Sequence, residues 1–370
     1  MKSIDEIVAR HQVVICAGSG GVGKTTTAAA LALHAAQRGR RTMVMTIDPA
    51  RRLADALGLR TLGNAARAVD IGGAGSLEAM MLDQKGAWDA LVERYAPSAE
   101  VRTRILGNRF YQHLSESFAG SQEYMAIEQL AELHASGRYD LIVVDTPPTR
   151  HALDFLEAPR RIAAFLDRQV IRWFIKPYFS AGWSTLRVVN RAAGSLLRRL
   201  EDATGIKALV EISDFFNSMS ALFDGFEVRV QRVDKLLHSK HTAFVLVTSP
   251  EEQVLDEAES FVRQLAELAV PLRAVVFNRV QREALADWRR LDEAWLRELV
   301  GTVVKRGERA GPLVDNFLRY ETQARGDQLR MEAFRRQLGA KPVVAVVPNF
   351  EEDLHDLAGL RRMLPHLVAA

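Results

Sequence analysis

A glycine-rich run near the start of the chain has the residue types that bind phosphate. Residues 18–25 read GSGGVGKT and fit the pattern G-x-x-x-x-G-K-[ST]. Glycines at these positions let backbone N–H groups turn toward phosphate oxygens, and the following helix points the positive end of its dipole at them. We therefore expect a nucleotide-binding loop in which Lys24 reaches the β- and γ-phosphates and Thr25 is a ligand of Mg²⁺. The residues expected to contact the nucleotide here are Gly20, Gly21, Val22, Gly23, Lys24, Thr25 and Thr26.

Two acidic residues that follow other apolar runs could serve the same site. Asp145 comes directly after the run LIVV, and Asp48 follows a second run. A magnesium site beside such a loop needs a carboxylate at the end of a neighbouring strand, so we predict this role for Asp145. Asp48 has two interpretations. It orients the water that attacks the γ-phosphate, or it caps the turn that begins at Pro49.

Short apolar runs that recur between helical patterns indicate the fold. The runs are continuous rather than alternating, which is typical of a parallel sheet covered on both faces. We expect strands at residues 13–16, 42–47, 141–144, 243–248, 272–277 and 343–347. Helical patterns at residues 25–37 and 251–268 follow two of these runs. This alternation predicts a doubly wound α/β fold with a mainly parallel sheet.

One region interrupts the alternation. Between residues 152 and 237 there is no strand pattern, and large apolar residues from Phe215 to Leu237 recur at helical spacing. We therefore predict a P-loop NTPase domain in two parts, residues 1–151 and 238–370, separated by a helical insertion subdomain at 152–237. The second part includes a further helical stretch at about residues 281–338.

The helical insertion has two interpretations. The apolar stripe from Phe215 to Leu237 is broad enough to bind an apolar partner, or it lies inside a closed helical bundle. The aromatic residues between Trp173 and Trp183 are compatible with core packing, with a groove lid and with a membrane-surface face.

Composition narrows the class of protein. The 370 residues are 48% hydrophobic and 26% charged with a net charge of +3, an ordinary globular composition that gives no reason to expect nucleic acid as a partner. The single cysteine, Cys16, excludes an internal disulfide and a CxxC zinc site within the chain. No uncharged apolar stretch approaches the roughly 20 residues of a membrane span. We expect a cytoplasmic protein, with peripheral membrane association left open.

Taken together, the motifs resemble the ArsA family of P-loop ATPases, which have a deviant Walker A loop. This family includes the arsenite-pump ATPase and the ATPase that delivers tail-anchored membrane proteins. The strongest matches are residues 18–27, residues 48–53 (DPARRL) and residues 145–151 (DTPPTRH). Weaker matches are residues 118–124 and 275–279. They follow one another in the family's order and span most of the chain.

The resemblance implies an ATP-hydrolysing switch that uses ATP or ADP with Mg²⁺. It implies that Asp48 positions the hydrolytic water and that Asn278 reads adenine. It also implies that the loop beginning at Pro348 flanks the base. Residues 145–149 would relay the nucleotide state to the helical insertion.

The resemblance also implies a dimer, because family members face each other across two nucleotides and this chain has one P-loop. Two departures bear on that dimer. The family lysine that reaches the partner's phosphates is replaced by Ser19, and the CxxC that joins subunits through zinc is absent. We therefore expect either a homodimer or a heterodimer with a paralogue that carries the missing lysine.

Several outputs remain open for such a switch. It could chaperone a hydrophobic client helix or membrane protein, drive a membrane pump, or regulate a partner. Arsenite binding needs cysteine thiolates, and Cys16 lies alone in an apolar run, which disfavours arsenite. A weakly hydrolysing or non-hydrolysing regulatory module is an alternative class. A MinD-like partitioning ATPase fits less well, because of DPARRL and the helical insertion.

Overall fold

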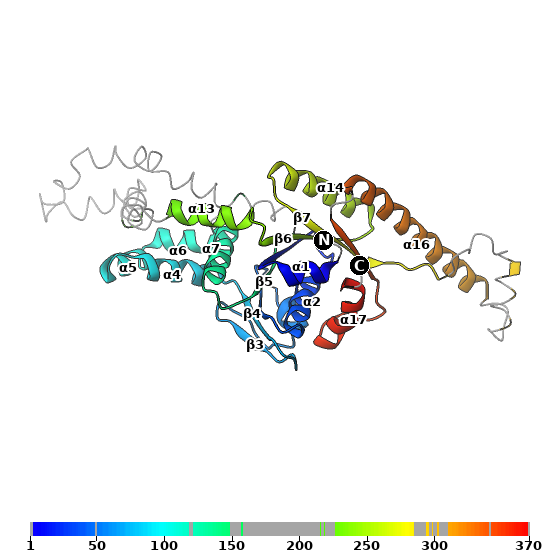
Figure 1. The fold of residues 1–370 in the computed structure, drawn as a ribbon, viewed down its shortest axis with the longest axis horizontal. Helices are drawn as coiled ribbons and strands as arrows, with labels where there is room; N and C mark the ends of the chain where they lie inside the picture. The colour runs from blue at the N-terminus through cyan, green and yellow to red at the C-terminus, as the bar shows by residue number, and fades with distance from the viewer. Residues whose placement is uncertain are drawn as a thin grey trace, which may run out of the picture.

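An eight-stranded sheet, in the order β3-β4-β2-β5-β1-β6-β7-β8, forms the centre of the molecule (Figure 1). The computed structural model describes residues 3–48, 50–117, 121–148, 157, 215, 218, 226–284, 294–295, 298, 302, 310–339 and 342–368. Neighbouring strands pair in parallel except for β3 and β4, which are antiparallel. The strands are β1 (Val13–Ala17), β2 (Arg41–Thr46), β3 (Arg67–Val69), β4 (Ser76–Met81), β5 (Leu141–Asp145), β6 (Thr242–Thr248), β7 (Leu272–Val280) and β8 (Val343–Pro348).

Helices cover both faces of this sheet, which confirms the predicted doubly wound α/β fold. One face is covered by α1 (Ile4–Arg10), α2 (Lys24–Gln37), α3 (Arg52–Ala56) and α17 (Leu357–Val368). The other face is covered by α4 (Gln84–Tyr95), α5 (Ala99–Leu106), α6 (Arg109–Ser117), α7 (Ser121–Ala135), α13 (Phe226–Leu237), α14 (Glu252–Glu267) and α16 (Ala310–Leu338).

The continuous apolar runs follow from this double covering. In β1, Val14 and Cys16 belong to the core on the α2 side, whereas Val13, Ile15 and Ala17 belong to the core on the α7 side. Side chains alternate between the faces of a strand, so a strand buried on both faces has no position that requires a polar residue. All six predicted strands are present, and β3 and β4 are two strands that the pattern did not predict.

The parallel strands bring distant parts of the sequence to one edge of the sheet. The phosphate-binding pattern follows β1, Asp48 follows β2, Asp145 ends β5, and Pro348 ends β8. β2 to β5 lie on one side of β1 and β6 to β8 lie on the other, so the strand order reverses direction at β1. In open α/β sheets ligands bind at the carboxyl ends of the strands beside such a reversal.

The domain boundaries predicted at residues 151 and 237 stay predictions, because most of residues 149–225 lie outside the described part of the chain, as do Met219, Phe223 and the aromatic stretch 173–183. Members of the apolar stripe that the structure describes face inward. Phe215, Val233 and Leu237 are each 1% exposed. The Phe215 ring lies 5.2 Å from that of Phe110. These residues therefore match the closed-bundle interpretation.

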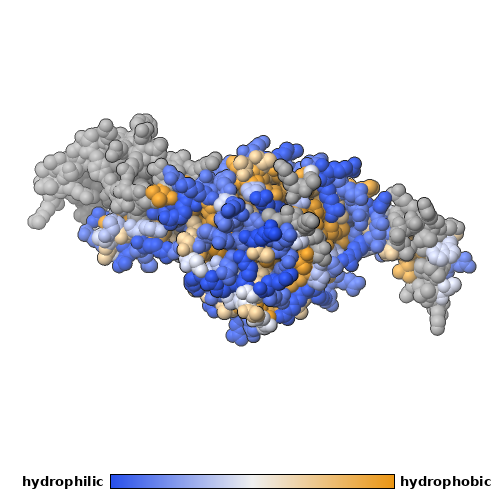
Figure 2. All heavy atoms as spheres, viewed as in Figure 1, coloured by the Kyte–Doolittle hydropathy of each residue, from blue (hydrophilic) through white to orange (hydrophobic). Residues whose placement is uncertain are grey.

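The surface of the described residues in the view of Figure 2 is largely hydrophilic, with apolar side chains scattered among polar ones. Within the described part of the chain, no helix combines the length and the apolar character needed to cross a bilayer.

Candidate functional site

The loop between β1 and α2 is shaped to surround an anion. Gly23, the residue before α2, has a φ of +91°, and a Cβ atom placed there would lie 2.3 Å from Nδ2 of Asn278. At Gly20 and Gly21 an added Cβ would meet nothing within 4 Å, so the loop there borders open space. The N-cap residue Gly23 has no side chain to cap the first turn of α2, and that turn contains no acidic residue. Its backbone N–H groups are therefore available to a phosphate.

Lys24 lies across this loop. Its ammonium group donates a hydrogen bond of 2.8 Å to the backbone oxygen of Ser19. Burial lowers the pKa of Lys24, while Asp145 and Asp48 raise it. The side chain of Ser19 is itself buried, and its Oγ atom has no hydrogen-bond partner among the described residues.

Thr25 and Asp145 form the predicted pair at the ends of α2 and β5. The Thr25 hydroxyl donates to Oδ2 of Asp145 at 2.7 Å, and the Thr46 hydroxyl donates to the same oxygen at 2.9 Å. Asp145 is 1% exposed. Burial raises the pKa of Asp145 to about 6, although the hydrogen bonds from Thr25 and Thr46 act to lower it.

These residues fit a hydrated Mg²⁺ bound together with phosphate. The second carboxylate oxygen of Asp145, Oδ1, is buried and has no hydrogen-bond partner in the described part of the chain. A buried carboxylate oxygen without a donor is suited to accept from a metal-bound water. Among the described residues no three His, Cys, Asp or Glu side chains converge on a metal site, so nucleotide oxygens would have to supply further ligands.

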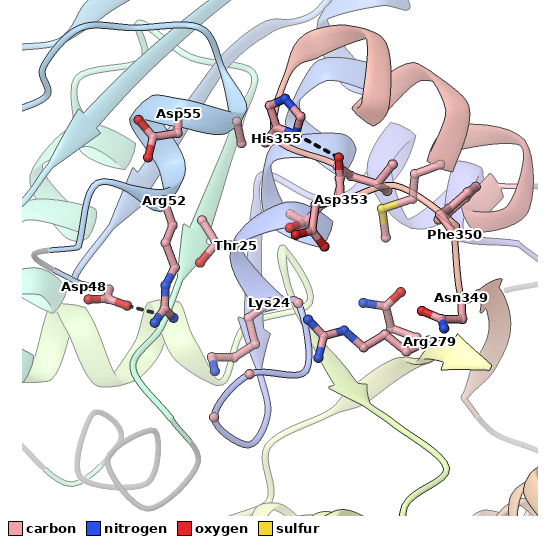
Figure 3. Close-up of a pocket in the computed structure, with 18 of the residues that line it drawn as sticks. Lys24, Thr25, Asp48, Arg52, Asp55, Arg279, Asn349, Phe350, Asp353 and His355 are labelled. Carbon is pink, nitrogen blue, oxygen red and sulfur yellow. Dashed lines mark hydrogen bonds and ion pairs between the residues drawn. The ribbon is translucent and has the colours of Figure 1, made fainter. Parts of the chain in front are cut away.

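Asp48 combines features of both interpretations given above. Its Oδ1 atom accepts a hydrogen bond of 2.9 Å from the backbone N–H of Ala50, which caps the turn. Its Oδ2 atom lies 3.6 Å from Nη1 of Arg52, at the edge of the cavity (Figure 3). Pro49 lies outside the described residues. Capping of the turn therefore uses Oδ1 of Asp48, and Oδ2 remains on the side of the nucleotide cavity.

A cavity of about 480 Å³ joins the P-loop to the ends of β7 and β8. Its volume lies within the range of about 300–1,000 Å³ that small-molecule sites occupy. Nine of the predicted site residues line it, namely Gly20, Gly21, Gly23, Lys24, Thr25, Thr26, Asp48, Asn278 and Pro348. Two predicted residues do not line it. Val22 is buried behind the loop, and Asp145 is buried behind Thr25.

Asn278 reaches the P-loop because β7 is irregular at this point. The pairing of β7 with β8 shifts register between Phe277 and Val280. Nδ2 of Asn278 donates to the backbone oxygen of Val22 at 2.8 Å. Since that oxygen can only accept, the amide orientation is determined, and Oδ1 of Asn278 remains as an acceptor.

Sequence patterns did not single out several residues that line the cavity. Arg279 belongs to a matched motif but received no role, and its φ of +58° is unusual for a residue with a side chain. Figure 3 shows its guanidinium group between Lys24 and Asn349. The other unanticipated lining residues are Asp55, Ala56, Glu352, Asp353, Leu354, His355 and Met363. The irregularity in β7 has no residue-type signal of its own, so sequence patterns could not predict that Arg279 lines the cavity.

Comparison with known proteins finds a matching family and similar chains. A family model described as anion-transporting ATPase matches residues 11–300. The chain is 27% identical over 268 residues to the ATPase GET3 of Malassezia globosa, with 72% of each chain covered. It is 29% identical over 270 residues to the ATPase get3 of Aspergillus terreus and 28% identical over 270 residues to the ATPase GET3 of Ajellomyces dermatitidis. In both cases 72% of each chain is covered.

Proposed function

The chain belongs to the anion-transporting ATPase family and is an ATPase, and we propose that it hydrolyses Mg²⁺-bound ATP in the cavity between the P-loop and the ends of β7 and β8. The observation that carries this proposal is the Thr25–Asp145 pair. It places a hydroxyl and an unsatisfied buried carboxylate oxygen beside an open phosphate loop. Phosphoryl transfer depends mainly on positioning and on neutralising phosphate charge, and this arrangement provides both.

We propose a distinct role for each side chain of the phosphate site. The N–H groups of the P-loop and the ammonium of Lys24 hold the β- and γ-phosphates. Thr25 and a water on Asp145 hold Mg²⁺, which neutralises charge on the phosphate oxygens when it is bound. The carboxylate of Asp48 orients the attacking water. Lys24 would exchange the Ser19 oxygen for phosphate when the nucleotide enters.

We further propose that the base lies at the other end of the cavity, beside Asn278, Pro348 and Phe350. The free Oδ1 atom of Asn278 can accept a hydrogen bond from the 6-amino group of adenine. Guanine presents a carbonyl oxygen at this position, which would face another acceptor. ATP is therefore the expected substrate rather than GTP.

Substitutions at the phosphate site test this function by separating binding from hydrolysis. Lys24→Ala should abolish nucleotide binding or nearly so, because a buried cation that contacts the phosphates is lost. Asp48→Asn should retain ATP binding and lose turnover by about 100-fold, the order expected for a group that acts in the transition state. Thr25→Val should raise the Mg²⁺ concentration needed for half-maximal activity. Calorimetric binding and phosphate release measure these effects.

A matched threonine controls for damage to the fold. Thr42 is fully buried, and its hydroxyl donates to the backbone oxygen of Arg40. Thr42→Val should therefore leave the Mg²⁺ dependence of hydrolysis unchanged. The proposed site is wrong if Lys24→Ala binds and hydrolyses ATP as the unmodified protein does.

We propose that the working unit is a pair of subunits facing each other across two nucleotides, as the family resemblance implies. The second subunit is either a copy of this chain or a paralogue with the lysine that Ser19 replaces. The family resemblance, which includes the ATPase that delivers tail-anchored membrane proteins, supports a hydrophobic client helix as the partner. We place this activity in the cytoplasm, with peripheral contact to a membrane when a client is delivered.

A further inference from the structure

Arg52 enters the nucleotide cavity from the side opposite Arg279. It is the first residue of α3, and it lines the same cavity as Lys24 and Thr25. Figure 3 shows its side chain extending from α3 toward the phosphate loop, with its guanidinium group beside Asp48. The side chain is 67% exposed, so it has room to change its contacts without disturbing the core.

The contact between Arg52 and Asp48 is loose. Their closest atoms, Nη1 and Oδ2, are 3.6 Å apart, which is longer than a hydrogen bond between charged groups. Exposed ion pairs of this kind contribute little to stability, because each charge remains solvated. A phosphate group with several negative charges would compete effectively for the same guanidinium.

The charges around Arg52 favour an anion in this part of the cavity. Burial lowers the pKa of Lys24, and the Arg52 guanidinium lowers it further, whereas Asp145 and Asp48 raise it. Arg52 and Lys24 are therefore close enough to repel each other. Two cations that repel each other across one solvent-filled volume are both stabilised by an anion that lies between them.

The neighbouring arginine has a different environment. Nη2 of Arg51 donates a hydrogen bond of 2.6 Å to the backbone oxygen of Arg60. Arg51 lines a separate small hollow with Thr61 and Leu62, and it is not among the residues that line the nucleotide cavity. The two adjacent arginines thus provide a test residue and its control.

We propose that Arg52 is a catalytic residue that leaves Asp48 when ATP binds and contacts the γ-phosphate. This inference rests on the proposed function of the same site. The exchange has two effects in one movement. The guanidinium stabilises negative charge on the γ-phosphate oxygens in the transition state, and the freed Oδ2 atom of Asp48 accepts a hydrogen bond from the attacking water.

The reaction at this contact is the hydrolysis of the terminal phosphoric anhydride bond. The water oxygen forms a bond to the γ-phosphorus while the bond between that phosphorus and the β–γ bridging oxygen breaks. The bridging oxygen leaves with the bonding electron pair on ADP. One proton of the water stays on the released phosphate, and the other passes to solvent. Arg52 remains protonated throughout and acts only through charge and hydrogen bonds.

Arg52→Gln tests this role in the full-length protein. We expect kcat to fall by about 100-fold with little change in KM, because the contact is made mainly in the transition state. Affinity for Mg²⁺–ADP with aluminium fluoride, a transition-state analogue, should fall by a similar factor, while affinity for ADP alone stays the same. Arg52→Lys should recover part of kcat, because it keeps the charge but loses the forked geometry. Arg51→Gln should match the unmodified protein in both measurements.

Different outcomes identify which idea fails. If Lys24→Ala is inactive but Arg52→Gln keeps full kcat and full affinity for the fluoride complex, Arg52 is only a partner of Asp48 and the inference is overturned. A higher kcat in Arg52→Gln would overturn it in the same way. If Lys24→Ala itself remains active, the proposed function of the site fails first.

Discussion

Asp145 shows at the scale of one residue how a functional site can cost folding stability. Its carboxylate is buried and only half satisfied, and burial raises its pKa from an ordinary value near 3.8 to about 6. Folding without a bound metal therefore favours the protonated form. The stabilising contribution of the protonated Asp145 side chain to the free energy of unfolding is fully present below pH 4. It is lost as the pH rises through about 6.

Asp145→Asn should accordingly stabilise the nucleotide-free protein at neutral pH. The amide is uncharged and can still accept from Thr25, so the variant avoids the cost of a buried charge. The difference in unfolding free energy should be near zero at pH 4 and grow to about 3 kcal/mol in favour of the variant by pH 8, following the pKa shift. Chemical denaturation at several pH values in a chelator measures it.

Asp140 provides the opposite control. Its carboxylate accepts from the Arg41 guanidinium and backbone, which lower the pKa of Asp140 to about 2. Asp140→Asn should be slightly less stable than the unmodified protein above pH 4, and that deficit should disappear as the pH falls toward 2. If the stability difference between Asp145→Asn and the unmodified protein does not vary with pH, burial does not raise the pKa of the Asp145 carboxylate.

At the scale of elements, a buried ion pair joins α13 to α7. Nε of Arg229 lies 3.1 Å from Oε1 of Glu128, and both side chains are almost fully buried. The Tyr124 hydroxyl donates to the other oxygen of Glu128 at 3.0 Å. The guanidinium group also lies 4.2 Å above the ring of Tyr95 in α4. Arg229, in the first turn of α13, therefore joins α13 to α7 and α4.

Arg229→Met should destabilise the protein by about 3–5 kcal/mol, because it leaves the Glu128 carboxylate buried without its cation. Burial already raises the pKa of Glu128, and Arg229 acts against that shift. Adding Glu128→Gln should recover most of the loss, because no buried charge remains and the amide oxygen can still accept from Tyr124. A double-mutant cycle by denaturant unfolding measures the coupling. Additive losses in the double variant would contradict this account.

The same scale shows what the sequence could and could not predict. Strands such as β1 and β6 are continuous apolar runs, so their pattern alone predicted them. The sequence of β4 is SLEAMM, whose Leu, Glu, Ala and Met favour helix in isolation. It is a strand because it pairs in parallel with β2, and Leu77 and Ala79 then enter one core while Met80 enters the other. Such tertiary pairing overrides local preference.

The candidate site likewise contains residues that the sequence could predict and residues that it could not. The phosphate loop and Asp145 have fixed residue types at fixed spacing, so sequence could predict them. The proximity of Arg52 to Asp48 depends on the start of a five-residue helix, and the position of Arg279 depends on a left-handed backbone conformation. Neither geometry has a residue-type signature. The structure was therefore needed to place these two cations at the cavity.

At the scale of the whole molecule, the nucleotide should control association. Asp48→Asn retains the groups proposed to bind ATP but should not hydrolyse it, so it should hold the ATP-bound state. We expect light scattering to give twice the monomer mass for this variant with Mg²⁺–ATP and the monomer mass for Lys24→Ala under the same conditions. A client helix should co-purify with the Asp48→Asn form.

The control for this prediction is the unmodified protein with ADP, which should match Lys24→Ala. If the mass stays that of one chain with Mg²⁺–ATP, a copy of this chain is not the second subunit. The remaining proposal is then a heterodimer with a lysine-bearing paralogue, which is tested by mixing the two proteins. If neither produces a dimer, the face-to-face arrangement is wrong.

The buried thiol in β1 makes the protein a convenient object for site-specific labelling. Cys16 is the only cysteine, its side chain is fully buried, and burial raises its pKa. Thiolates react with maleimide dyes whereas buried thiols do not, so the folded chain should stay unlabelled without any substitution. A cysteine introduced at Val228, which is 59% exposed on α13, would carry the only dye. Its fluorescence could follow that helix during ATP turnover.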